Sequence, residues 1–168
     1  MQSFMKPKSF KEIPLTQNQF ALVDPEYFNY LNQWKWYVIC VKTLKYAVRN
    51  SKTVNGKRHR IRMHQVILGK KENMITDHIN GNGLDNQRNN LRFATRTQNF
   101  INRKIHKNNT SGYKGVSWIK RDKKWYSNIR VNRKTINLGC FQNKKIAATT
   151  YNIAAKRYFG EFARLNII

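Results

Sequence analysis

A short polar stretch of the chain carries four residues whose types and spacing suit chemistry on a phosphate ester: Asp77, His78, Asn90 and Asn99. Asp77 and Asn99 both offer hard oxygen atoms, which Mg²⁺ prefers, with waters and a substrate phosphate completing its octahedron. An imidazole near neutral pH can take a proton from a water molecule that attacks phosphorus. The stretch therefore predicts a magnesium site beside His78, and we expect the amide of Asn90 to bridge backbone groups of the loop between them.

The elements that must position these residues are short. The patterns predict a strand over 75–79, an Asn- and Gly-rich loop over 80–86, a strand over 89–94 and a helix capped by Thr95. This order would let Asp77 and Asn99 converge on one point. Successive side chains of a strand point to opposite sides, so His78 reaches the same site only if the strand end is kinked.

Each of these features also has a purely structural interpretation. An Asp-His pair is common, an Asn- and Gly-rich loop can be only a turn, and Asn99 and Asn102 can simply be exposed helix residues. The loop is not a calcium-binding loop, because Arg88 stands where a bidentate Glu is required. The set is specific only through its joint order and spacing.

Composition points to a polyanion as partner. The chain of 168 residues has 33 Lys and Arg but 8 Asp and Glu, a formal net charge of +25, and such a field attracts phosphate. Taken alone, this favours a structural nucleic-acid binder. Hydrophobic residues at 40% suffice for packed cores. We expect neither a membrane span nor a signal peptide, and the isolated Cys40 and Cys140 exclude a disulfide scaffold and a thiolate zinc site.

The segment before the polar stretch is predicted to be rich in strands. Asp24 is expected to cap a short helix with Pro25 at its first position, and Asn55-Gly56 is a hairpin signal. The other expected elements are strands over 20–23, 36–41 and 44–48, a strand ending near 63, and a helix over 64–68 that stops at Gly69.

The segment after it is predicted to hold three strands and one helix. Strands are expected over 114–119, 125–131 and 135–141, and the second alternates between an inner and an outer face. Asn132-Arg133 marks a turn. Asn143 is expected to cap the helix and Gly160 to end it, with an apolar face of Ala147, Tyr151, Ala154, Ala155 and Tyr158.

The polar stretch resembles the HNH endonucleases of the homing, phage type. The resemblance rests on Met63-His64-Gln65-Val66-Ile67, Asp77-His78-Ile79-Asn80-Gly81-Asn82, Asp85-Asn86, Asn89-Asn90-Leu91-Arg92, Thr95, Gln98-Asn99 and Asn102. It implies a ββα-metal core that uses one divalent ion to nick or cut double-stranded DNA. The implied roles are metal ligands for Asp77 and Asn99, general base for His78, and loop bracing for Asn90. Asn99 replaces the family's final His, which favours Mg²⁺ (with Mn²⁺ as a substitute) over Zn²⁺, and no structural zinc is expected. His64 recurs in the resemblance and is assigned a packing role.

Residues 109–166 resemble a second family, the DNA-binding domain of plant ethylene-response factors. The resemblance rests on Ser111-Gly112-Tyr113-Lys114-Gly115-Val116-Ser117-Trp118, Lys124-Trp125, Ile129-Arg130-Val131, Leu138-Gly139-Cys140-Phe141, Ala147-Ala148, Tyr151 and Ala154-Ala155 to Phe159-Gly160. It implies a three-stranded sheet that lies in the major groove with a helix behind it. The implied groove-facing residues are Lys114, Ser117, Ile119, Asn128, Arg130, Thr135 and Asn137, of which Lys114 and Arg130 keep the positive charge.

These predictions combine into an α+β protein: a β-rich platform over 1–60, a nuclease core over 61–105, a linker over 106–111 and a DNA-binding domain over 112–168. Further DNA contacts are expected from Arg62, Arg92 and Arg103. The predicted function is a site-specific, monomeric, phage-encoded DNA endonuclease in the cytoplasm of a bacterial host, without a small-molecule cofactor or a membrane partner. Two alternatives remain open: a sequence-specific regulator with an inactive nuclease centre, and a structural nucleic-acid protein.

Overall fold

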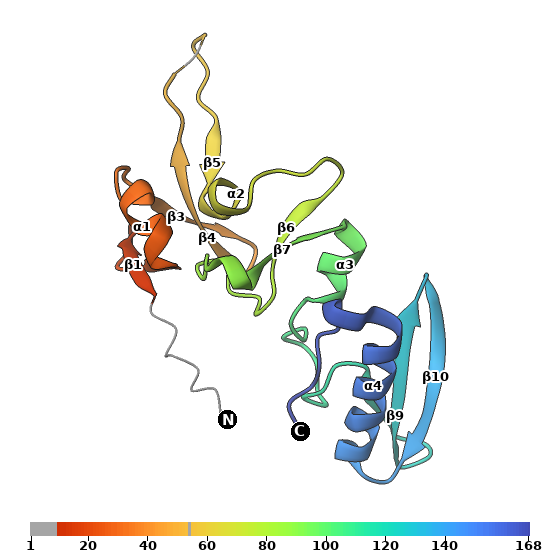
Figure 1. Cartoon of the computed structure of the whole chain (residues 1–168). Coiled ribbons are helices and arrows are strands. Elements are labelled where there is room, and N and C mark those ends of the chain that lie inside the picture. Colours follow the sequence, from red (N-terminus) through yellow and green to blue (C-terminus); the bar gives the residue numbers. More distant parts are fainter. Residues whose placement is uncertain (1–9, 54) are drawn as a thin grey trace, which may run out of the picture. The chain divides into compact units, whose positions relative to one another are not determined.

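Short helices and small antiparallel sheets make up the computed structural model, which describes residues 10–53 and 55–168 (Figure 1). This confirms the predicted α+β class. The chain divides into two units, one up to Thr95 and one from Arg96 onward, and each is described by itself. No helix among the described residues is long and apolar enough to cross a membrane.

The first unit begins with two small sheets around one apolar core. Their antiparallel elements are β1 (Lys11–Pro14) with β2 (Phe20–Val23), and β3 (Tyr37–Val41), β4 (Leu44–Asn50) and β5 (Arg60–Arg62), with α1 (Pro25–Leu31) between the sheets in sequence. Ile13, Val23, Leu31 and Met63 are fully buried in the core. Burial of such side chains is the main term that holds small sheets together.

Two local predictions for this region have different outcomes. Asn55 and Gly56 have φ angles of 50° and 70°, as a tight hairpin turn requires, and β4 pairs with β5 as expected. The neighbouring Val54 lies outside the described residues. Asp24 does precede α1, but its side chain makes no capping hydrogen bond. Its Oδ2 instead accepts a hydrogen bond from the backbone N–H of Arg88 at 2.6 Å. Asp24 and Pro25 therefore stand at the predicted N-cap and first helical positions, but the side chain of Asp24 does not cap the helix.

The rest of the first unit carries the polar stretch. It consists of α2 (Met63–Leu68), β6 (Ile75–His78), the single 3₁₀ turn η1 (Arg88–Asn90) and β7 (Leu91–Ala94), with β6 and β7 paired antiparallel. The helix ends at Gly69, which has a φ of 83°, as predicted. The predicted strand over 89–94 starts only at Leu91, because Asn90 donates back to the carbonyl of Gln87 and closes a turn.

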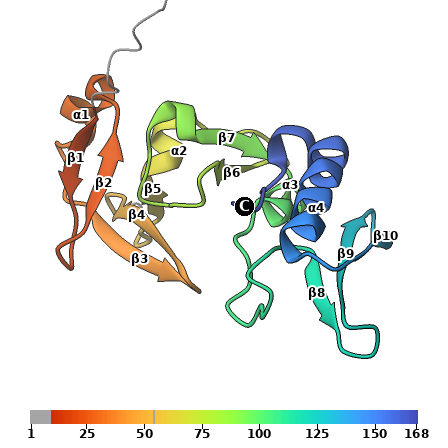
Figure 2. The same cartoon turned by 90° about the horizontal axis from the view of Figure 1, so that it is seen from below.

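The second unit is a three-stranded sheet with one long helix packed on it (Figure 2). After α3 (Arg96–Ile101), β8 (Val116–Ile119), β9 (Lys124–Val131) and β10 (Lys134–Phe141) pair in the order β10-β9-β8, followed by α4 (Lys144–Phe159) and η2 (Gly160–Phe162). Ile129 from the sheet packs against Tyr151, Ala154 and Ala155 from α4. The small alanines let the helix backbone approach the sheet closely.

Local signals predicted the helix ends in this unit. Asn143 Oδ1 accepts hydrogen bonds from the backbone N–H groups of Lys145 at 2.8 Å and Ile146 at 3.4 Å, and Gly160, with a φ of 54°, ends α4. Asn132 and Arg133 both have positive φ in the turn between β9 and β10. Tyr158 was expected on the buried face but is 43% exposed, whereas the neighbouring Phe159 packs against the core.

Candidate active site

Asp77 and His78 are adjacent on β6 and have different surroundings, as strand alternation requires. Asp77 is buried, and its Oδ2 lies 2.9 Å from both Nε and Nη2 of Arg92. Asp77 and Arg92 are also paired across β6 and β7. The pairing of two nearly buried charges is required here, since a lone buried carboxylate is very costly.

His78 faces an aromatic cluster in the first unit. The centre of its ring lies 5.1 Å from that of His64 and 5.9 Å from that of Tyr46, while His64 and Tyr46 are 5.7 Å apart. The Nε2 atom of His78 is 3.4 Å from Oδ1 of Asn86. His64 was assigned a packing role from the sequence, and in the structure it packs directly against the ring of His78.

Burial keeps both imidazoles of the cluster neutral. It lowers the pKa of His64 to about 3, with further lowering from nearby His78 and Arg62. Burial also lowers the pKa of His78, against an opposing influence from the Asn86 hydrogen bond and the carboxylates of Asp77 and Asp85. A neutral imidazole has a nitrogen lone pair, so His78 has the protonation state that a general base needs.

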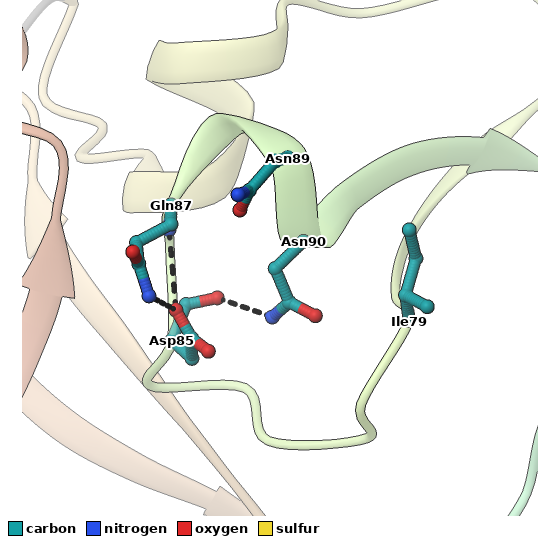
Figure 3. Close-up of a pocket in the computed structure, with 5 residues that line it drawn as sticks. All are labelled: Ile79, Asp85, Gln87, Asn89 and Asn90. Atoms are coloured by element: carbon teal, nitrogen blue, oxygen red, sulfur yellow. Dashed lines mark hydrogen bonds between the residues drawn. The ribbon is translucent and has the colours of Figure 1, made fainter. Parts of the chain in front are cut away.

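The loop after β6 is held by side-chain amides and one carboxylate (Figure 3). Asn90 Nδ2 donates to the carbonyl of Asp85 at 2.8 Å, and Asn90 Oδ1 accepts from the N–H of Asn80 at 3.0 Å. The carboxylate of Asp85 accepts from Nδ2 of Asn80 at 2.7 Å and from Nε2 of Gln87 at 2.9 Å. Asn90 thus makes contacts of the kind that loop bracing requires.

Two contacts of this loop are missed by sequence reasoning. Asp85 is buried inside the amide network, and residues 84–86 form a short parallel bridge to Leu22 of β2. Asp85 stands in the stretch that carries the HNH resemblance, and its rarity as an acid in this basic chain was a signal. No sequence pattern near Leu22 or near residues 84–86 predicts the bridge to β2.

The second predicted metal ligand, Asn99, lies on α3 in the second unit. Its convergence with Asp77 stays a prediction. No group of three or more His, Cys, Asp or Glu side chains that could hold a metal occurs among the described residues. A site with one carboxylate, one amide oxygen and several waters fits the chemistry of Mg²⁺, which keeps much of its water when bound.

The residues predicted to face the DNA groove fall on one face of the sheet in the second unit, with one exception. The register pairs Arg130 with Thr135 and Asn128 with Asn137, and cross-strand partners share a face. Ser117 is paired with Tyr126 and Ile119 with Lys124, and by strand alternation Tyr126 and Lys124 share the face of Asn128 and Arg130. The opposite face carries Ser127 and Ile129, which are buried, so the predicted alternation along β9 is confirmed.

The face that carries Asn128 and Arg130 is called the open sheet face. It consists of Ser117, Ile119, Lys124, Tyr126, Asn128, Arg130, Thr135 and Asn137.

Lys114 is the exception. It precedes β8, and its Nζ donates to the carbonyl oxygens of Ile101 and, at 3.0 Å, Arg103. Burial lowers the pKa of Lys114 to about 8, with repulsion from Arg164 adding to the shift. The expectation that Lys114 presents its charge from the sheet is therefore wrong, because the ammonium group is used inside the unit.

The three other arginines predicted to contact DNA differ in exposure. Arg62 is exposed at the end of β5, and Arg103 is exposed after α3, with its guanidinium 4.8 Å from the centre of the Phe100 ring. The side chain of Arg92 is 11% exposed and pairs with Asp77. Arg92 is therefore engaged with Asp77 inside the first unit. Arg62 and Arg103 have the exposure that a phosphate contact needs.

Comparison with known proteins gives two viral relatives. The chain is 36% identical over 88 residues to "Protein 3.8" of Escherichia phage T7, covering 52% of this chain and 72% of the relative. It is 29% identical over 155 residues to "Uncharacterized HNH endonuclease L560" of Acanthamoeba polyphaga mimivirus, covering 89% of this chain and 75% of the relative. No protein-family model matches, and no solved structure gives a significant match. The second name supports the HNH resemblance, whereas the resemblance of residues 109–166 to the plant domain stays a prediction.

Proposed function

Because this chain belongs to the same family as Protein 3.8 of Escherichia phage T7, and a mimivirus relative is named an HNH endonuclease, we propose that it is a metal-dependent DNA endonuclease. The observation that carries the proposal is the pair at the end of β6. It combines a buried carboxylate, Asp77, with a neutral imidazole, His78, in a protein with a net charge of +25. The charge accounts for attraction to DNA, and the pair supplies groups suited to phosphodiester hydrolysis.

In the proposed reaction His78 removes the proton of the attacking water. Its neutral state supports this role, because a ring already protonated could not accept a second proton. Asp77 and Asn99 would hold Mg²⁺, and Arg92 keeps the Asp77 carboxylate in a fixed position. When bound, Mg²⁺ supplies positive charge that stabilises the phosphorane-like transition state and the departing 3′ oxygen.

The test of the catalytic role compares His78→Ala with the wild type on supercoiled plasmid and on phage DNA in Mg²⁺ or Mn²⁺. Loss of a general base lowers the rate by about 10²- to 10⁴-fold, while DNA binding in a footprint stays unchanged. His106→Ala is the matched control, because His106 is exposed and lies outside the aromatic cluster. Cleavage by His78→Ala at the wild-type rate would contradict the assignment.

The same experiment separates the alternatives. A specific footprint without cleavage by the wild type would identify a regulator with an inactive centre. Binding without a preferred sequence, and with a steep salt dependence, would identify a structural nucleic-acid protein. Mapping the cleaved ends on each strand also distinguishes nicking from cutting of both strands.

We further propose that the open sheet face anchors the enzyme in the major groove, with Arg130 as the base-reading residue. Arg130 is exposed on this face near the end of β9, and its cross-strand partner is Thr135 on β10. Removing a bidentate arginine–guanine contact costs about 1–3 kcal/mol. Arg130→Ala is therefore expected to lower affinity for the cleaved site about 5- to 150-fold and to relax specificity there. Arg157→Ala is the control, because Arg157 is an exposed residue of α4, on the helix that packs on the other side of the sheet. Equal losses of DNA affinity in both variants would refute anchoring through the sheet.

A further inference from the structure

We propose that Asn86 is a positioning residue that fixes the tautomer of His78, and that strand β2 in turn holds Asn86. The inference about the tautomer stands on the geometry of the first unit alone, and only its kinetic consequence rests on the proposed function. Asn86 lies eight residues after His78 and is fully buried (0% exposed).

The orientation of the Asn86 amide follows from its two side-chain contacts. Its Nδ2 donates to the backbone carbonyl of Leu84 at 3.2 Å, and a carbonyl can only accept. The NH₂ group must therefore face Leu84, which places Oδ1 toward His78. An amide oxygen also only accepts, so Nε2 of His78, 3.4 Å away, must be the nitrogen that carries the hydrogen.

The backbone of Asn86 is fixed by β2. Its N–H donates to the carbonyl of Leu22 at 2.8 Å, and the N–H of Leu22 donates to the carbonyl of Leu84 at 2.9 Å. Two residues further along each segment, the N–H of Arg88 donates to the side chain of Asp24. The N-terminal hairpin therefore sets the position of the amide that contacts His78, and it contributes to the centre without supplying a reacting group.

A fixed tautomer has a chemical consequence for the ring. With the hydrogen on Nε2, the lone pair of a neutral imidazole lies on Nδ1, so Nδ1 is the atom that can take a proton. A ring free to exchange tautomers would spend part of its time with the hydrogen on the wrong nitrogen. In the Ser-His-Asp triad, a ring held in the wrong tautomer loses most of its activity, and Asn86 prevents the equivalent loss here.

The test is the ring ¹⁵N spectrum of the protein labelled at its four histidines, recorded without DNA or metal. Long-range ¹H–¹⁵N correlations distinguish the two neutral tautomers, and His78→Ala identifies the signals of His78. The wild type is expected to show the Nε2–H form. Asn86→Leu removes the acceptor, so the signals of His78 are expected to shift toward a mixture or toward the Nδ1–H form.

Two further variants keep the test decisive. Asn86→Asp retains an acceptor oxygen and is expected to preserve the Nε2–H form, so it replaces Asn86→Leu if that variant does not fold. Asn89→Leu makes the same chemical change close by in the chain, at an exposed residue. It is expected to leave the tautomer unchanged. An Nδ1–H form in the wild type or in Asn86→Asp, or a pure Nε2–H form in Asn86→Leu, would overturn the inference.

Kinetics then show whether the tautomer matters for catalysis. Asn86→Leu is expected to lower kcat for DNA cleavage by about 10- to 100-fold, less than removal of the base itself, with KM unchanged and with recovery in Asn86→Asp. If the tautomer responds as expected but the wild type does not cleave DNA, the proposed function fails and the positioning of His78 stands. If the wild type cleaves and the tautomer does not depend on Asn86, the positioning inference fails alone.

Discussion

The two units bury different kinds of residues. Among the described residues, the first unit buries His64, Asp77, His78 and Asp85 together with the amides of Asn86 and Asn90. The second unit buries no histidine or carboxylate, and its interior is Ile129, Tyr151 and a row of alanines, with Asn102, Ser111 and Ser127 as its buried polar residues. Burying ionisable groups costs free energy, so proteins concentrate them where chemistry requires it.

This difference separates the units by what each one buries. The first buries two neutral imidazoles and an ion-paired carboxylate, at a cost in stability. The second packs one helix against one sheet through apolar side chains, and the open sheet face lies on the other side of that sheet. Each unit is therefore expected to lose stability through a different kind of change.

The largest effect is expected at Gly115 in the second unit. A Cβ atom there would lie 2.1 Å from Cδ2 of Tyr151 and 2.6 Å from the carbonyl oxygen of Asn128, and the φ of 74° already disfavours any side chain. Gly115→Ala is therefore expected to destabilise the second unit by at least about 4 kcal/mol. Hydrogen exchange should show loss of protection in β8–β10 and α4, while β6 and β7 stay protected.

The control for this substitution is Gly112→Ala. Gly112 has nearly the same φ, 76°, but open space around the added Cβ, so it should lose only about 1–2 kcal/mol from backbone strain. Simultaneous loss of protection in both units of Gly115→Ala would show that they unfold as one and that the comparison is wrong.

A smaller effect for each pH unit is expected from acid on the first unit. The pKa of His64 is lowered by burial from 6.5 to about 3, so the unfolded chain binds a proton that the folded chain does not in this range. The contribution of His64 to stability is complete above pH 6.5 and is lost as the pH falls toward 3, at about 1.4 kcal/mol per pH unit.

His64→Phe keeps a ring beside Tyr46 and His78 but removes this titration. In urea unfolding at several pH values it should flatten the acid slope of the first unit, while His106→Phe, at an exposed position, should not. The second unit should lose little stability over the same range. An unchanged slope in His64→Phe would mean that other groups dominate the acid sensitivity.

The smallest effect is expected at the start of α4. Asn143→Ala removes the side chain that accepts from Lys145 and Ile146, which costs about 1 kcal/mol. The melting temperature of the second unit should fall, and the tautomer of His78 should not change. Asn143→Asp restores the acceptor and should recover the stability; failure to recover would assign the loss to something other than the cap.

Features set by neighbours in sequence were predictable. The cap at Asn143, the stop at Gly160 and the alternation along β9 depend on residues a few positions apart, and the structure confirms them. The opposite surroundings of Asp77 and His78 follow in the same way from the period of a strand. The candidate centre could be located from the sequence because its residues lie close together in the chain.

Features set by distant contacts were not predictable. Asp24 has every local property of a helix cap, yet its carboxylate bonds to Arg88, because a backbone N–H from another segment is within reach in the folded chain. Lys114 has a plausible place on a DNA-binding face, but its ammonium meets the carbonyls of Ile101 and Arg103. The contact of Asn86 with His78 likewise depends on where the loop lies, which β2 decides.

The hydrogen bond between Arg88 and Asp24 joins residues 64 positions apart. Closing a chain loop of that length costs about 4 kcal/mol of entropy before any contact is gained. The hairpin of β1 and β2 can form early, because its strands are neighbours in sequence. The backbone hydrogen bonds of Leu22 with Leu84 and Asn86 can form only after residues 84–86 have been synthesised. During synthesis the contact between His78 and Asn86 can therefore form only after the loop that contains residues 84–86 has left the ribosome.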